Sequence, residues 1–376
     1  MSQFLIVCGG TGGHLAPGIA VAEGLLKRGH SCRLVISRKE VDSRLIRDYP
    51  HLEYLRAPGR GYGGGVAGVL ASGFDLLRGI IFAWLLFKKE QPERILAFGG
   101  FLSLGMVMVA RLYRIPVALH EANNRPGRVI RWVRKMADRV YMPPRVRMHG
   151  VAMERVRHFG YPVREGVRCV SQSEARESLS IDVDRRLLVV VGGSQGAEAL
   201  NIWVDKHFAE LANVGITVYC VTGASKEREP IRRAQSREGH NVYCYSVGFS
   251  GEMGALLSAA DLVISRAGAG AIAELIRCCV PGILVPYPHA SDDHQLANAR
   301  EHERLGAALV VEQKRLHELL AEVQELIFND WLLNRFKENL RAMDELDATR
   351  AIVDDLEAIT ANAGASSEIS TAESSL

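Results

Sequence analysis

Short apolar runs that end in a glycine-rich turn and then continue as a helix pattern occur four times in this chain. The first is "VCGGTGGHLAPGIAVAEGLLKRGH", in which Gly9–Gly13 directly follow a strand pattern that ends at Val7. The others are "LLVVVGGSQGAEALN", "ILAFGGFLSLG" and "DLVISRAGAGAIAEL", which begin at Leu187, Ile95 and Asp261. Strand, glycine turn and helix in alternation are typical of parallel α/β sheets.

These turns also predict where a ligand binds. The first N–H groups of a helix and its positive dipole end attract an anion, and glycine lets a ligand approach the backbone closely. The first turn is not the dinucleotide fingerprint G-x-G-x-x-G, because Leu15 stands in place of the third glycine and no acid with a clear ribose role follows. Since ligands of open α/β sheets bind beyond the carboxyl ends of the strands, the four turns predict one ligand cleft.

The length of 376 residues favours two domains or more. Strand patterns are expected in two groups: Phe4–Val7, Cys32–Ile36, Ile95–Phe98, Val117–His120 and Arg139–Met142, then Leu187–Val191, Thr217–Val221, Asn241–Tyr245, Leu262–Ser265, Gly282–Val285 and Ala308–Val311. The stretch "FGYPVREG" is the best linker, so the predicted domains are 1–163 and 164–360. Val323–Leu356 is helical in pattern, and residues 361–376 are expected to be a disordered tail.

The composition is that of a soluble globular protein, with 48% apolar and 24% charged residues. The net charge of +3 does not favour a nucleic-acid partner. Seven scattered cysteines lack zinc-ligand spacing and no secretory signal pattern precedes them, so reduced thiols in a cytosolic protein are expected. No run reaches the roughly 18 apolar residues of a spanning helix.

Six motifs occur in the order "GGTGGH", "HEANN", "GYPVR", "GGSQGA", "SRAGAGAIAEL" and "VPYPHASDDHQLANA". Together they resemble the motifs of the MurG family, the UDP-N-acetylglucosamine (UDP-GlcNAc) transferases that convert lipid I to lipid II in peptidoglycan synthesis. The resemblance runs from about Phe4 to about Arg350 and implies the GT-B fold: two Rossmann-like α/β domains with parallel sheets facing a central cleft. It also implies that the terminal helix of the second domain crosses back to the first.

The resemblance assigns the sugar nucleotide mainly to the second domain. There it implies donor contacts from Ser194, Gln195, Ser250, Gly268, Ala269, Glu274, His294, Gln295 and Asn298. From the first domain and the linker it adds Thr11, Gly12, Gly13, Asn123 and Arg164. The chemistry agrees, because a carboxylate such as Glu274 accepts both protons of a ribose diol and amides both donate to and accept from sugar hydroxyls. The sequence departs from the family at "GFSGEM", where Ser250 replaces an apolar residue.

The acceptor, lipid I, is implied for the first domain. Its contacts would come from Gly10, Gly99, Gly100 and Phe101, with the backbone N–H groups of the two glycine turns receiving its diphosphate. Phe101 stands where the family commonly has tyrosine, so a phenol contact is lost. Tyr161 departs from the family's asparagine, and no role is assigned to it.

The implied reaction is an inverting glycosyl transfer, which needs one base for the acceptor hydroxyl. His14 is the first candidate, because an imidazole titrates near neutral pH and the dipole at a helix start keeps it basic. Glu121 is the rival, and the sequence does not decide between them. Without a D-x-D signature at a donor site, no metal ligand and no required cofactor are predicted, and a stimulatory divalent cation is left open. Helix N-termini and Arg266 or Arg164 would instead stabilise the diphosphate.

The expected location is the cytoplasmic face of the cell (inner) membrane, as a peripheral protein, because lipid I is a membrane lipid. The candidate contact is "GIIFAWLLFKKE", from Gly79, whose apolar residues exceed one core-facing helix stripe. Residues 111–157 add twelve Arg or Lys side chains against three acidic ones, which suits an anionic membrane surface. A core helix is the equal alternative for Gly79–Phe87.

Other cell-wall synthesis proteins are further candidate partners. The alternatives to the transferase are another GT-B enzyme, such as a glycolipid synthase or a sugar-nucleotide epimerase, and a membrane scaffold that has lost catalysis. An epimerase needs acid and base groups on both faces of the sugar, and only one persuasive set is present. The retained His14, Glu274, Gln295 and Asn298 argue against a scaffold.

Overall fold

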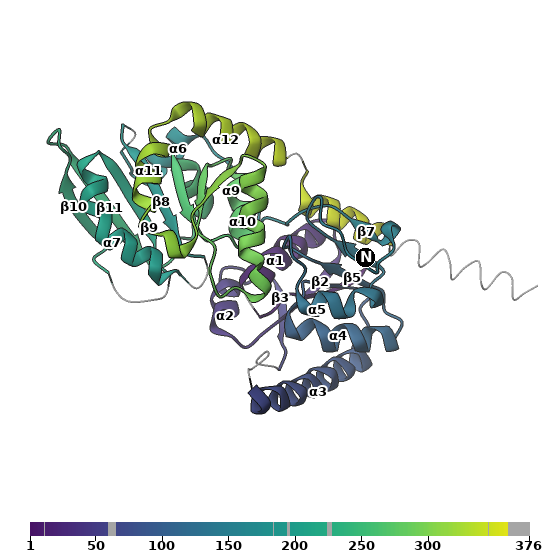
Figure 1. Ribbon diagram of the computed structural model, residues 1–376. Coiled ribbons are helices and arrows are strands. Elements are labelled where there is room, and N and C mark those ends of the chain that lie inside the picture. Colours follow the sequence, from purple (N-terminus) through teal and green to yellow (C-terminus); the bar gives the residue numbers. More distant parts are fainter. Residues whose placement is uncertain are drawn as a thin grey trace, which may run out of the picture. The chain divides into compact units, whose positions relative to one another are not determined.

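The computed structural model describes residues 1–359 apart from 11, 59–64, 183, 194–195, 224–227 and 345, and it leaves the side chains of 40, 41, 44 and 65–72 undescribed. The chain forms two compact α/β units (Figure 1). Unit 1 comprises residues 1–122, 126–164 and the segment from Leu346 onward, and unit 2 comprises 123–125 and 165–345. The division after Arg164 lies one residue from the predicted boundary.

Unit 1 is built on a parallel sheet with the strand order β3-β2-β1-β4-β5-β6-β7. The strands are β1 (Gln3–Val7), β2 (Ser31–Ile36), β3 (Glu53–Arg56), β4 (Arg94–Ala97), β5 (Val117–His120), β6 (Arg139–Tyr141) and β7 (Val156–Arg157). The helices are α1 (Gly12–Lys27), α2 (Glu40–Arg47), α3 (Gly65–Lys89), α4 (Gly100–Leu112) and α5 (Arg128–Val133), with short 3-10 turns at Arg134–Met136 and Met153–Arg155.

Alternate residues of the central strand β1 pack into two different cores. Leu5 and Val7 belong to the core that also contains residues of α3, α4 and α5, three helices that are labelled next to one another in Figure 1. Phe4 and Ile6 face the opposite core, which α1 shares with a last helix at 348–359. Period-2 alternation along a strand places these side chains on opposite faces, so the sheet of unit 1 is covered on both sides.

The last helix is joined to unit 1 by polar contacts as well. Asp355 accepts a hydrogen bond from the Tyr141 hydroxyl at 3.0 Å and lies 3.3 Å from Arg139 Nε. Arg28, directly after α1, forms ion pairs with Asp354 and Glu357. Ile352, Val353 and Leu356 are buried in the same core as α1.

Unit 2 contains a second sheet with the order β10-β11-β9-β8-β12-β13-β14, parallel except for the antiparallel pair β10–β11. The strands are β8 (Arg186–Val191), β9 (Ile216–Val221), β10 (Ile231–Gln235), β11 (Asn241–Val247), β12 (Leu262–Ser265), β13 (Gly282–Leu284) and β14 (Ala308–Val310). The helices are α6 (Gln172–Ser178), α7 (Glu198–Asn213), α8 (Met253–Ala259), α9 (Ala269–Arg277), α10 (His294–Arg304), α11 (Leu319–Ile327) and α12 (Asp330–Met343), with 3-10 turns at Ser291–Asp293 and Gln313–Arg315.

The predicted fold class is confirmed, and three strands were missed. β3 has mostly exposed side chains, β7 has only two residues, and β10 alternates exposed and half-buried positions with two arginines, so none of them shows an apolar run. The helical pattern over Val323–Leu356 is confirmed, and the structure divides this stretch among α11, α12 and the helix at 348–359.

Candidate active site

The first glycine turn lies where the strand order of unit 1 changes direction. β1 and β4 are neighbours in the sheet, so the turns after Val7 and after Ala97 open beside each other at its carboxyl edge. A Cβ atom on Gly100 would lie 3.2 Å from Nδ1 of His14. The half-buried His14, at the start of α1, therefore lies against the second glycine turn as well as following the first.

The backbone of the first turn is not bare, contrary to the sequence-based expectation for Gly10. The Gly10 N–H donates to Oδ2 of Asp42 at 2.9 Å, and its carbonyl accepts a hydrogen bond from Lys39 Nζ at 2.9 Å. At Gly9, a Cβ would lie 2.2 Å from the backbone nitrogen of Ser37, so only glycine fits this close approach to the end of β2. An anion that binds this turn must therefore use N–H groups beyond Gly10.

The far end of the same turn is held by Tyr161, to which the sequence assigned no role. The Tyr161 hydroxyl donates to the Gly13 carbonyl at 3.1 Å. Thr11 lies outside the described residues, so its expected donor contact is not placed. The family comparison pointed away from Tyr161 because the position differs from the usual asparagine, and only the fold shows its contact with Gly13.

His120 is a buried neutral imidazole behind the two turns. Its Nε2 lies 2.8 Å from the Gly160 carbonyl, which can only accept, so Nε2 carries the proton. Burial lowers the pKa of His120 to about 4, the Gly160 hydrogen bond opposes this shift, and the nearby His14 adds to it. His120 is thus neutral at physiological pH and serves as packing for the site.

Glu121, the rival base, is only 3% exposed. Its Oε2 accepts the Gly127 N–H at 2.7 Å, at the N-cap of α5. The Glu121 carboxylate therefore stabilises the turn between β5 and α5. In the second glycine turn, Gly99 is buried with a φ of 85°, Gly100 has a φ of 73°, and Phe101 is half-buried. These positive φ values suit glycine alone.

In unit 2 the strand order changes direction between β8 and β12, so the turns that follow these strands lie at one edge. Ser194 and Gln195, in the first of these turns, lie outside the described residues. After β12, Gly268 forms the N-cap of α9 and has no side chain to cap the N–H groups that follow, including that of Ala269. Glu274, half-buried, lies within α9. The donor contacts expected of Gly268, Ala269 and Glu274 stay predictions.

The segment before α10 has an unusual backbone. Asp292 and Asp293 both adopt left-handed conformations, with φ of 53° and 52°. Asp293 is the N-cap of α10, but its side chain makes no capping hydrogen bond. His294 Nδ1 lies 2.6 Å from the Ser291 carbonyl, and Gln295 Oε1 accepts the Tyr287 N–H at 2.9 Å. Strained backbone of this kind is often found at ligand sites.

Asn298 is 2% exposed and its amide is occupied by protein partners. Its Nδ2 donates to Oδ1 of Asn123 at 3.1 Å and to the Ala267 carbonyl at 3.2 Å. Its Oδ1 accepts the Asn124 N–H at 2.9 Å. Both asparagines were predicted as donor contacts, and the structure joins them to each other.

Two arginines expected near the diphosphate have other partners in the structure. Arg266 is 7% exposed, and its guanidinium donates to the carbonyls of Val285 and Pro286 and to Gln313 Oε1 at 2.7 Å. Burial lowers the pKa of Arg266, and its expected phosphate contact stays a prediction. Arg164 donates weakly to the Tyr49 hydroxyl, at 3.5 Å.

Ser250 lies half-buried in the turn after β11, where its hydroxyl accepts the Glu252 N–H at 3.3 Å. Its predicted donor contact stays a prediction. Within the described part of the chain, no cluster of three or more His, Cys, Asp or Glu side chains could hold a metal ion.

Comparison with known proteins identifies the family. The profile of the glycosyltransferase family 28 N-terminal domain matches residues 4–142, and that of the family 28 C-terminal domain matches residues 187–350. The UDP-N-acetylglucosamine–N-acetylmuramyl-(pentapeptide) pyrophosphoryl-undecaprenol N-acetylglucosamine transferase of Opitutus terrae is 48% identical over 372 residues, 99% of each chain. The transferase of the same name from Nitratidesulfovibrio vulgaris strain Hildenborough is 33% identical over 95% of this chain and 97% of its own.

Among solved structures, Acinetobacter baumannii MurG has a TM-score of 0.72 at 26% sequence identity, covering 95% of this chain and 99% of its own. The matches to family profiles, relatives and structure extend over both α/β units. The chain therefore belongs to glycosyltransferase family 28, and within it to the MurG family of N-acetylglucosamine transferases.

Proposed function

We propose that this protein transfers N-acetylglucosamine from UDP-GlcNAc to lipid I, the undecaprenyl-diphospho-MurNAc-pentapeptide, with release of UDP and formation of lipid II. The observation that carries the proposal is 48% identity over 99% of the chain to a relative whose name states this donor, this acceptor and this transfer. The glycine turns of unit 1 and the open start of α9 in unit 2 supply a place for each diphosphate.

The donor is assigned to unit 2. The N–H groups from Gly268 onward receive the diphosphate of UDP-GlcNAc, and the Glu274 carboxylate accepts the hydroxyls of the ribose. His294 and Gln295 lie at the start of α10, next to the left-handed aspartates, and contact the sugar. Asn298 affects the donor site indirectly. Its amide is hydrogen-bonded to Asn123 and to the Asn124 N–H, and it thereby holds residues 123–124 in place.

The acceptor is assigned to unit 1, and the geometry favours His14 as the base. A hydroxyl of the acceptor's muramyl sugar attacks the anomeric carbon of GlcNAc, while UDP leaves from the opposite face, so the configuration inverts. His14 takes the hydroxyl proton, since it lies at the junction of both glycine turns. Glu121 is sealed from solvent and holds Gly127, which suits a role in placing the acceptor turn.

The membrane-facing surface is proposed to be the exposed side of α3 with its neighbours α4 and α5. The α3 apolar face comprises Phe74, Leu77, Ile81, Trp84 and Leu85, each 44% exposed or more. Leu112 on α4 and Trp132 on α5 are also exposed, at 79% and 64%. Isolated apolar side chains are common on protein surfaces, but several exposed apolar side chains on one helix, with a tryptophan among them, suit a lipid interface.

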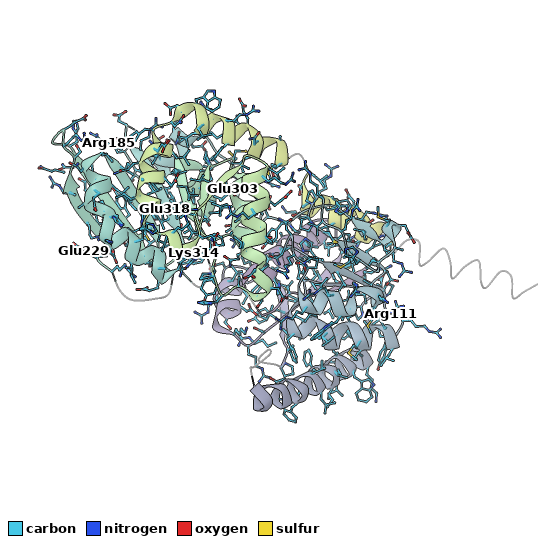
Figure 2. The ribbon with its side chains drawn as sticks, viewed as in Figure 1. Arg111, Arg185, Glu229, Glu303, Lys314 and Glu318 are labelled. Atoms are coloured by element: carbon cyan, nitrogen blue, oxygen red, sulfur yellow. The ribbon has the colours of Figure 1, made fainter. Side chains whose placement is uncertain are left out.

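Basic side chains border this surface. Lys88 lies 5.3 Å over the Trp84 ring, and Arg111 projects from the end of α4 into solvent (Figure 2). Arg128 and Arg131 on α5 are exposed. Near anionic lipid each such charge adds up to about 1 kcal/mol of attraction. Phe87 was predicted with the lipid contact and is instead fully buried, because it lies on the face of α3 that packs against α4. Among the described residues, no helix has the length and apolarity needed to cross a bilayer.

The deciding experiment measures UDP release from UDP-GlcNAc with and without a soluble lipid I analogue, and identifies the product anomer by NMR. Acceptor-dependent UDP release with a β-linked product supports the inverting transferase. Conversion of UDP-GlcNAc to another sugar nucleotide without an acceptor would instead indicate an epimerase. If UDP raises the Tm but no UDP is released from UDP-GlcNAc, the protein binds the nucleotide without catalysing transfer.

A further inference from the structure

Asp42, on α2, is a buried carboxylate that the proposed reaction does not use. It is 0% exposed, and its Oδ2 accepts hydrogen bonds from the Gly10 N–H at 2.9 Å, the Ser37 N–H at 3.0 Å and the Ser37 hydroxyl at 2.6 Å. Its Oδ1 is buried and accepts no hydrogen bond from the described residues. Acids are almost never fully buried without such partners, so this placement calls for a specific role.

The position of Asp42 is informative within an α/β domain. In dinucleotide-binding domains an acid after the second strand reaches out to a ligand's ribose. Asp42 also follows β2, but it is sealed from solvent and turned onto the glycine turn that follows β1. The side chain therefore contacts the turn that binds a ligand, and it does not itself reach a ligand.

The segment after β2 holds both backbone groups of Gly10. Asp42 takes its N–H, and Lys39 Nζ donates to its carbonyl. The Lys39 N–H in turn donates to Ser37 Oγ at 3.1 Å, which links the three side chains into one unit. Gly10 has a φ of 120°, a conformation that needs external support and suits glycine.

We propose that Asp42 is a positioning residue for acceptor binding: through Gly10 it fixes the first glycine turn and the start of α1, and thereby the place of His14. The inference rests on the proposed function, in which this turn receives the acceptor's diphosphate. Since the Gly10 N–H is already used, the diphosphate contacts the N–H groups that follow it, at the start of α1. Asp42 thus determines where along the turn the anion binds.

The test compares Asp42→Ala and Asp42→Asn with Asp48→Asn, an exposed acid at the end of the same helix. Steady-state kinetics give KM for a lipid I analogue and kcat, calorimetry gives the affinity for UDP, and amide hydrogen exchange reports on Gly10. We expect Asp42→Ala to lower kcat/KM for the acceptor on the order of 10–10²-fold, the effect of a displaced binding group. The affinity for UDP should stay within about twofold, because the donor is held by unit 2.

The asparagine variant keeps an oxygen that can accept the Gly10 N–H, so it should recover most of the acceptor affinity and of the Gly10 protection. Asp48→Asn should match the wild type. If Asp42→Ala does not fold, Ser37→Ala, which removes one of the bonds to Oδ2, should raise the acceptor KM by a smaller factor in the same direction. A lowered Tm with an unchanged acceptor KM in these variants would mean that Asp42 only stabilises the fold.

Failure of the positioning role of Asp42 and failure of the proposed function would give different results. A wild-type protein that shows no acceptor-dependent UDP release would overturn the transferase assignment. An active wild type whose Asp42 variants lose acceptor and donor affinity equally would overturn the positioning role alone.

Discussion

Asn298 on α10 donates its side-chain N–H to Oδ1 of Asn123 at 3.1 Å, so two residues 175 positions apart share one buried amide pair. The Asn298 oxygen accepts the Asn124 N–H, which makes the contact reciprocal. Because both polar atoms of the Asn298 amide have partners inside the protein, Asn298 holds the segment that follows Ala122. Substitutions at these two positions should therefore affect stability first.

Asn298→Ala should destabilise the protein by at least about 1–3 kcal/mol, because it leaves the Asn124 N–H and the Ala267 carbonyl buried without their partner. Urea denaturation followed by intrinsic fluorescence measures the change. Gln295→Ala, three residues earlier and half-buried, should leave stability within about 0.5 kcal/mol and weaken donor binding instead. Equal losses of donor affinity with unchanged stability in both variants would return Asn298 to the sugar contacts.

Glu274→Ala should weaken UDP-GlcNAc binding by roughly 1–3 kcal/mol, the range for a lost hydrogen bond to a charged group. Isothermal titration calorimetry measures the affinity directly. Glu325→Ala, an exposed acid on α11, is the matched control and should bind the donor normally. Unchanged affinity in Glu274→Ala would leave Glu274 as a helix-stabilising acid only.

His14→Ala should lower kcat by about 10²–10⁴ with little change in UDP affinity, because general-base catalysis contributes that much and His14 belongs to unit 1. His149→Ala, an exposed histidine of the same unit, serves as the control. Glu121→Gln keeps an oxygen for the Gly127 N–H and should retain most activity. A fall of less than tenfold for His14→Ala, with a larger fall for Glu121→Gln, would reverse the assignment of the base.

His120 should make the protein less stable in acid. The pKa of His120 in the folded state, about 4, lies below the ordinary value of 6.5. At a pH between these two values, His120 is protonated in the unfolded state and neutral in the folded state. The resulting loss begins as the pH falls below about 6.5 and levels off below about 4. It amounts to about 2 kcal/mol at pH 5 relative to pH 7.5.

The variant His120→Gln retains a donor for the Gly160 carbonyl and cannot titrate. Its stability relative to the wild type should therefore improve by that amount between pH 7.5 and pH 5, as measured by urea denaturation at the two values. An identical pH dependence for both proteins would show that His120 titrates normally in the folded state.

Ile81→Ser/Trp84→Ser should reduce binding to anionic vesicles in a co-sedimentation assay, because it removes apolar area from the centre of the α3 apolar face. Trp331→Ser, which alters a tryptophan 76% exposed on α12 of unit 2, is the control and should bind as the wild type does. High salt should weaken the wild type by screening the basic residues on α4 and α5. A folded double variant with wild-type binding would place the membrane contact elsewhere.

The two α/β units and the positions of the glycine turns follow from local sequence, because buried parallel strands appear as continuous apolar runs and sharp βα turns require glycine. The residues of β8 and the turn that begins at Gly192 can be recognised from their own short stretch of sequence, and so can the start of α9 at Gly268. The exposed, short or arginine-containing strands β3, β7 and β10 carry no such local signal. They form because neighbouring strands offer hydrogen-bonding edges.

Which of the expected polar groups are hydrogen-bonded within the protein depends on how the chain folds, and the sequence does not show it. Gly10, Asn298 and Arg266 were each expected at a ligand, and each is hydrogen-bonded to a residue between 19 and 175 positions away. Asp42 and Tyr161 were not expected at the site, and they hold the two ends of the first glycine turn. Sequence spacing predicts neighbours along one helix or strand, but a hydrogen bond between distant segments depends on how the strands are ordered in the sheet.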